Sequence, residues 1–76
     1  PEPTADLRAV VDAELAGLPP KYRDVLVACD LDGRPRAEVA AAFGLAAGTL
    51  SSRLAEARKR LADRLRRRGV TAAGLA

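Results

Sequence analysis

Histidine is missing from this chain of 76 residues, and cysteine occurs once, at Cys29. The first absence removes the commonest general base and metal ligand. The second rules out an intrachain disulfide, and because no signal-peptide pattern is present either, we expect a reducing cytoplasmic compartment. No apolar run approaches the length that spans a bilayer, so we expect no membrane partner. The chain begins with Pro1 rather than Met, which suggests a fragment of a longer protein.

Catalytic signals are equally scarce. The sequence offers no paired carboxylates in a cleft-forming context, no glycine-rich loop for phosphates and no metal-ligand spacing. We therefore expect no catalytic residue, no metal or other cofactor, and no small-molecule substrate.

Aromatic residues are nearly absent, since Tyr22 and Phe43 are the only two. The core must therefore be aliphatic, and the abundance of Leu, Ala, Arg and Glu favours helix over strand. A chain of this length holds one domain at most, with a small core. We expect an all-α domain of four helices over residues 1–70 and a flexible tail over residues 71–76.

Charge is divided unevenly along the chain. Residues 1–33 carry three bases and seven acids, a net charge of −4, whereas residues 34–76 carry ten bases and three acids, a net charge of +7. A segregated basic half is the electrostatic footprint of nucleic-acid binding. A solvated helical face in an Arg-rich protein produces the same pattern, so charge alone leaves both interpretations open.

Proline and glycine divide the chain into four helical segments. The first is expected over about residues 5–16 with Thr4 as its N-cap, and the second from Pro19-Pro20 to Asp32-Gly33. The third lies between Pro35 and Gly44. The fourth covers about residues 46–68, or begins at Thr49 if that residue is the cap. Helical spacing predicts that the most buried side chains include Leu26, Cys29, Val39, Phe43, Leu45, Leu50, Leu54 and Leu61.

Residues 36–54 show the pattern of two helices joined by a tight turn. In a helix-turn-helix the helices cross at about 90–120° over a short turn that often contains Gly. Ala40 is small enough for the close crossing, and Gly44 tolerates a positive φ. Leu45 can plug the turn, while Leu50 and Leu54 face inward. The same pattern occurs in a structural helical hairpin in which Gly44 is only a C-cap.

The opposite face of the fourth helix suits a DNA major groove. Ser51, Ser52 and Ala55 are small or polar enough to enter it, and Arg53 can reach a phosphate. This face is nearly uncharged, in contrast to the basic half of the chain that contains it.

Several motifs in one register make the chain recognisable. They are LPPKYRDVLV at 18–27, DLDG at 30–33, EVA at 38–40 and GTLSSRLAEAR at 48–58. Together they resemble the C-terminal (region 4) domain of the extracytoplasmic-function sigma factors of bacterial RNA polymerase, over about residues 7–68 without gaps. Several motifs at correct spacing are far more specific than any one of them.

The resemblance implies a transcription-initiation module that binds the −35 promoter element and docks on the β flap of RNA polymerase. It also implies anti-sigma factors as partners that occlude these surfaces, and a nucleoid-associated place of action. By position, the resemblance implies that Ser51, Ser52, Ala55 and Glu56 face base edges or nearby backbone, and that Arg53 and Arg58 lie at the same DNA-binding site, which also includes Gly48 and Thr49. Arg34 and Arg36, where family members are often polar or aromatic, are expected to add phosphate contacts from the preceding helix.

Two of these positions carry alternative roles. Arg53 and Arg58 are placed for phosphate contact or for ion pairs that brace the helix, and Glu38 is expected to support the scaffold.

Family members often carry Lys or Arg at position 51, a larger residue at 55 and Arg at 56, so the weak recognition face of this chain puts promoter specificity in doubt. A different helix-turn-helix regulator and a protein-interaction module therefore stay open as alternatives.

Overall fold

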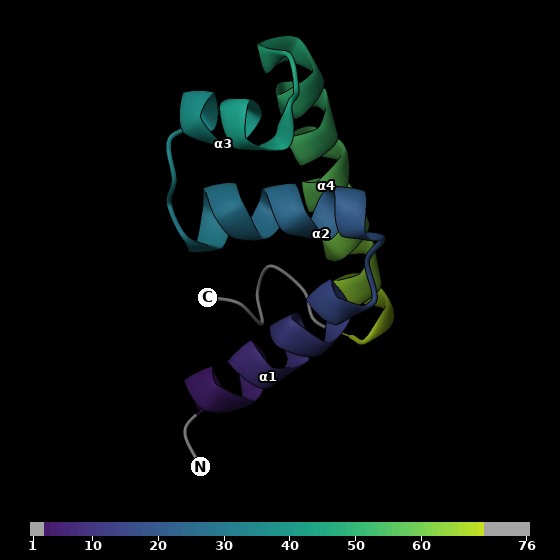
Figure 1. Cartoon of the computed structure of the whole chain (residues 1–76). Coiled ribbons are helices and arrows are strands. Elements are labelled where there is room, and N and C mark those ends of the chain that lie inside the picture. The colour runs from purple at the N-terminus through teal and green to yellow at the C-terminus, as the bar shows by residue number, and fades with distance from the viewer. Residues whose placement is uncertain (1–2, 70–76) are drawn as a thin grey trace.

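The computed structural model of the chain describes residues 3–69, which form four α-helices and a short π-helix (Figure 1). The elements are α1 (Pro3–Ala16), α2 (Pro20–Leu26), the π-helix η1 (Val27–Leu31), α3 (Arg36–Phe43) and α4 (Ala47–Arg67). Residues 3–69 contain no strand. The predicted all-α fold is confirmed. Because η1 continues α2 directly, the two together correspond to the single second segment that was predicted to end at Asp32-Gly33. The predicted tail over residues 71–76 lies outside the described residues.

Helix α4 is the element on which the others assemble. It contacts α1, α2 and α3 along its length. In Figure 1, α2 and α3 lie one above the other, α4 runs along one end of both, and α1 crosses below them. Among residues 3–69, no helix is both long and apolar enough to cross a membrane.

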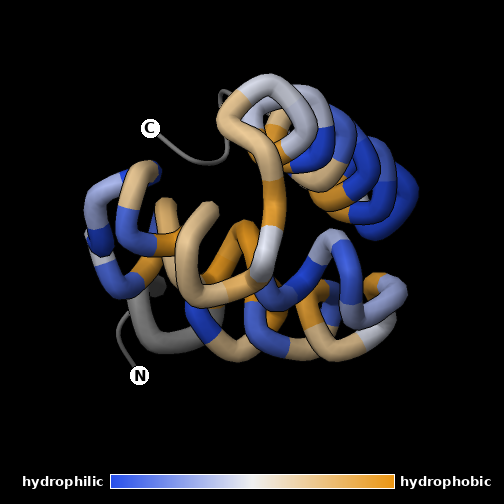
Figure 2. The backbone as a smooth tube through the Cα atoms, turned by 45° about the horizontal axis from the view of Figure 1, so that its top comes forward, coloured by the Kyte–Doolittle hydropathy of each residue, from blue (hydrophilic) through white to orange (hydrophobic). Residues whose placement is uncertain are grey.

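The core lies where the helices face one another, and it is aliphatic as predicted. Figure 2 shows hydrophobic segments turned inward and hydrophilic ones outward, most clearly along the long helix. Val39, Leu50 and Leu54 are at most 1% exposed, and Leu26 is buried with them. Three further residues predicted as core, Cys29, Leu45 and Leu61, are half-buried against this cluster.

Phe43 was predicted to be buried, and that prediction is wrong. Its residue is 37% exposed, although it follows the buried Val39 by four positions on the same helix. Phe43 is the last residue of α3, and the chain turns away at Gly44 immediately afterwards. The ring therefore lies at the edge of a core that aliphatic side chains already fill.

The start of α1 differs from its prediction, whereas the start of α4 follows the main prediction rather than the alternative at Thr49. Helix α1 begins at Pro3, so Thr4 lies within its first turn rather than at the cap. Proline is favoured there because the first helical N–H groups have no partner. Helix α4 begins at Ala47 with extended Ala46 as its N-cap, and not at Thr49. The Leu50 N–H already donates to the Ala46 carbonyl at 2.9 Å, which closes the first turn without a side-chain cap.

Candidate nucleic-acid interface

The turn between α3 and α4 has the geometry that the sequence predicted. Gly44 has φ 66° and ψ 34°, in the left-handed region that glycine adopts most easily. The Gly44 N–H donates to the Ala41 carbonyl at 3.3 Å, and the Leu45 N–H to the Ala40 carbonyl at 2.9 Å. These bonds close the end of α3 and direct the chain into α4, with half-buried Leu45 beneath the turn.

The first turns of α4 separate an inner face from an outer face. Leu50 and Leu54 are buried, and Ala57 continues that inner face one turn further along. The outer face carries the residues predicted to contact DNA, all of them exposed: Gly48, Thr49, Ser51, Ser52 and Ala55. The recognition face expected from the sequence is therefore a continuous small, polar surface.

Arg36 and Arg53 are available to bind an anion. Arg36 is the first residue of α3 and is exposed, whereas Arg53 is half-buried beside the outer face of α4. Within residues 7–69, whose side chains the structure describes, neither guanidinium has a carboxylate within salt-bridge distance.

Two roles were expected for Arg58, a phosphate contact or an ion pair that braces the helix, and the structure shows the ion pair. The Arg58 Nε and Nη2 donate to the two carboxylate oxygens of Asp30 at 2.8 and 2.6 Å. The hydrogen bonds from Arg58 lower the pKa of Asp30, against a smaller opposing effect of burial, and the nearby charge of Arg36 lowers it further. The same pairing raises the pKa of Arg58. This bridge joins the end of η1 to the middle of α4.

Two other predicted site residues, Arg34 and Glu56, form ion pairs with residues four positions away in the chain. The Arg34 Nε donates to Glu38 at 3.2 Å, and both side chains stay substantially exposed. The Arg60 Nε donates to Glu56 at 2.8 Å, one helical turn away. Exposed pairs of this kind contribute at most about 1 kcal/mol, so both can open when a stronger ligand approaches.

The basic end of α4 is directed at α1. Glu14 accepts a hydrogen bond from Arg64 at 2.9 Å and also pairs with Arg68, while its own side chain is only 13% exposed. Arg66 pairs with Asp63. Arg64 and Arg68 therefore connect the end of α4 to α1 through Glu14, whereas the Arg66–Asp63 pair lies within α4.

Two residues that the sequence analysis did not assign to the site lie beside it. Lys21 and Tyr22, from the start of α2, line an open hollow of about 410 Å³ together with residues of α4. Its α4 lining is Gly48, Thr49, Ser52, Arg53 and Glu56. No local pattern links Lys21 with Arg53, because their placement around one hollow depends on how α2 crosses α4.

An all-α chain with a left-handed glycine turn, two buried leucines beneath it and an exposed polar helix face is a helix-turn-helix domain. The family model described as "Sigma-70, region 4" matches residues 8–61. The chain belongs to this family, as a region 4 domain of an extracytoplasmic-function sigma factor. It is a DNA-binding promoter-recognition module and not an enzyme.

A curated relative supports the same assignment. The chain is 39% identical over 61 residues to the protein named "ECF RNA polymerase sigma factor SigE" of Mycolicibacterium smegmatis. The match covers 80% of this chain but only 22% of that relative. The chain thus spans about a fifth of the length of the relative that it matches. No solved structure matches the chain.

Proposed function

We propose that this domain recognises the −35 element of a promoter by inserting the first turns of α4 into the major groove. The observation that carries the proposal is the exposed strip of Ser51, Ser52 and Ala55 directly outside the buried Leu50 and Leu54. A major groove is about 12 Å wide and admits an α-helix whose N-terminal residues contact base edges. Gly48 and Thr49 allow close approach of the helix start to the DNA.

In this proposal, Arg36 and Arg53 contact DNA phosphates while α4 lies in the major groove. Neither has a carboxylate partner among the described side chains of residues 7–69, so DNA binding breaks no ion pair within that part of the chain. Arg34 can join them by exchanging Glu38 for a phosphate. Arg58 acts indirectly, because its bridge to Asp30 positions α4.

Base readout on this face rests on short side chains. The hydroxyls of Ser51 and Ser52 can donate to or accept from base edges, and the Ala55 methyl can contact a thymine methyl. Glu56 can accept from a cytosine amino group only by leaving Arg60. With no arginine placed for bidentate contact to guanine, we expect modest sequence discrimination.

A second surface is proposed for RNA polymerase. Leu7, Val11 and Leu31 line a groove between α1 and η1, rimmed by Arg8, Asp12 and Asp32. Leu31 is 57% exposed, which is unusual for a large apolar side chain in a small domain. We assign this groove to the β flap of the polymerase, and an anti-sigma factor would act by covering it. A module with these partners works in the cytoplasm, at the nucleoid.

The DNA proposal is tested by measuring affinity as a function of salt. Each phosphate contact contributes about −0.9 to the slope of log affinity against log salt, so about four contacts give a slope near −3.6. Arg36→Ala and Arg53→Ala should each lower the slope by about one unit on every duplex. Ser52→Ala should change which selected duplex is preferred and leave the slope alone. An affinity independent of salt would reject DNA binding by this domain.

Polymerase docking is tested separately with the isolated β flap. Leu31→Asp should abolish flap binding and leave DNA affinity intact, while Arg36→Ala should do the opposite. If Leu31→Asp binds the flap as tightly as the unmodified chain does, the groove is not the docking surface.

A further inference from the structure

The hollow between α2 and α4 brings together chemistry from two distant parts of the chain. Lys21 and Tyr22 come from the first turn of α2, whereas Thr49, Ser52 and Arg53 come from the start of the recognition helix. The hollow thus has two cations and three hydroxyl-bearing side chains around an open space of about 410 Å³. Three of its lining residues, Gly48, Thr49 and Ser52, also belong to the proposed DNA-contacting face.

The positive charges of this hollow are not consumed by the fold. Among the side chains of residues 7–69, seven of the thirteen bases pair with a carboxylate, and Lys21 and Arg53 are not among these seven. The one acid in the lining, Glu56, is held by Arg60 at 2.8 Å, outside the lining set. The charge that would repel an anion is therefore neutralised, while the two that attract it stay available.

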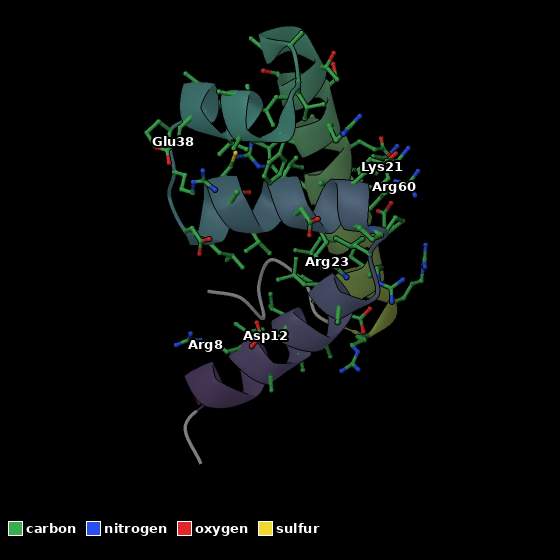
Figure 3. All side chains as sticks on the ribbon, in the orientation of Figure 1. Arg8, Asp12, Lys21, Arg23, Glu38 and Arg60 are labelled. Atoms are coloured by element: carbon green, nitrogen blue, oxygen red, sulfur yellow. The ribbon has the colours of Figure 1, made fainter. Side chains whose placement is uncertain are left out.

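Tyr22 holds this arrangement in place. The Lys21 Nζ lies 5.0 Å from the centre of the Tyr22 ring, and the Arg60 guanidinium lies 4.4 Å from it. Both distances are within the range of cation–π attraction. Figure 3 shows Lys21 and Arg60 next to each other beside α4. The ring thus orders Lys21 at the hollow and Arg60 at Glu56.

Lys21 and the first turn of α3 lie on opposite flanks of the domain. In Figure 3, Lys21 is at the right and Glu38, two residues after Arg36, is at the left. A helix in a major groove has one phosphate backbone on each side of it. Arg36 is placed for one backbone, and the hollow is placed for the other.

We propose that the hollow binds a backbone phosphate of DNA between Lys21 and Arg53, with the hydroxyl of Thr49 donating a hydrogen bond to it. The inference rests on the proposed DNA binding and adds Lys21 as a positioning residue, with Tyr22 as its support. The contact is independent of base sequence, and it fixes how deeply and at what angle α4 enters the groove.

The test compares two variants that each remove one positive charge. Lys21→Gln removes the proposed contact, whereas Lys59→Gln, the matched control, removes an exposed α4 lysine that is outside the hollow and without a salt bridge within residues 3–69. On any duplex, Lys21→Gln should lower the salt slope by about 0.9 and affinity at 0.1 M salt roughly eightfold, the effect of one phosphate contact. Lys59→Gln should change the slope much less, and both variants should keep the unmodified thermal midpoint.

A second measurement locates the phosphate. Single neutral methylphosphonate linkages are placed, one at a time, along a duplex. The linkage position that weakens DNA binding by the unmodified domain should not weaken DNA binding by Lys21→Gln. Equal slopes for Lys21→Gln and Lys59→Gln, or no position with this lost coupling, would overturn the phosphate site while leaving DNA binding intact. If the unmodified domain shows no salt-dependent binding, both proposals fail.

Discussion

The guanidinium of Arg58 holds both carboxylate oxygens of Asp30, 28 residues earlier in the chain, at 2.8 and 2.6 Å. The bridge ties the π-helical end of the second segment to the middle of the recognition helix. Bidentate arginine–carboxylate pairs add geometric definition as well as energy. The pair therefore helps to fix α4 against η1.

Breaking the bridge should cost little stability and alter DNA binding in a particular way. Because both side chains are partly exposed, we expect Arg58→Ala and Asp30→Asn each to lower the free energy of unfolding only slightly. The double variant should cost less than the sum of the two single variants, as urea unfolding of all four proteins would show. Arg58→Ala should weaken DNA binding without lowering the salt slope, and a loss of one slope unit would make Arg58 a phosphate contact instead.

Acid should release the same bridge. The pKa of Asp30 is lowered in the folded chain, mainly by hydrogen bonding to Arg58. Its contribution to stability is therefore complete above the unfolded pKa of about 3.9 and disappears as pH falls through the lower folded value. The difference in thermal midpoint between the unmodified domain and Asp30→Asn should stay constant from about pH 5 to 7 and shrink below about pH 4. A constant difference down to pH 2 would exclude the bridge as its source.

The left-handed turn at Gly44 should resist substitution. A β-branched side chain is strained at φ 66°, so Gly44→Val should lower the free energy of unfolding by about 1–3 kcal/mol. Gly48→Ala is the matched control, because Gly48 lies in α4 with open space where a Cβ would be. That variant should be neutral or more stable by up to about 1 kcal/mol. Chemical denaturation of both variants is the measurement, and an equal response would contradict the turn geometry.

Truncating the buried Leu54 should cost far more stability than truncating a leucine on the surface. Leu54 is 0% exposed, so Leu54→Ala should cost about 2–5 kcal/mol, enough to unfold much of a small domain at 37 °C. Leu31→Ala removes the same atoms from an exposed position and should cost less than about 0.5 kcal/mol. Circular dichroism melts of the two variants would distinguish them, and similar midpoints would mean that the inner face of α4 is wrongly identified.

Local chemistry determined much of this protein from its sequence. Pro20 and Pro35 restrict the backbone where α2 and α3 begin, and Gly44 supplies the left-handed turn after α3. The spacing of Leu50 and Leu54 set the inner face of α4 and thus its exposed opposite face. These signals act over a few residues, so they can be read without the fold. Phe43 escaped the same reasoning, because burial at the end of a helix depends on what packs beyond it.

Tertiary structure alone decided what the charges do. The sequence placed ten bases after residue 33 but could not say which of them would meet an acid. Arg64 pairs with Glu14, 50 residues away, and Arg58 is taken by Asp30. Lys21, in the acidic part of the chain, instead lies at the recognition helix. Ion pairs depend on where helices cross, and crossing points follow from packing of the whole core rather than from spacing along any one helix.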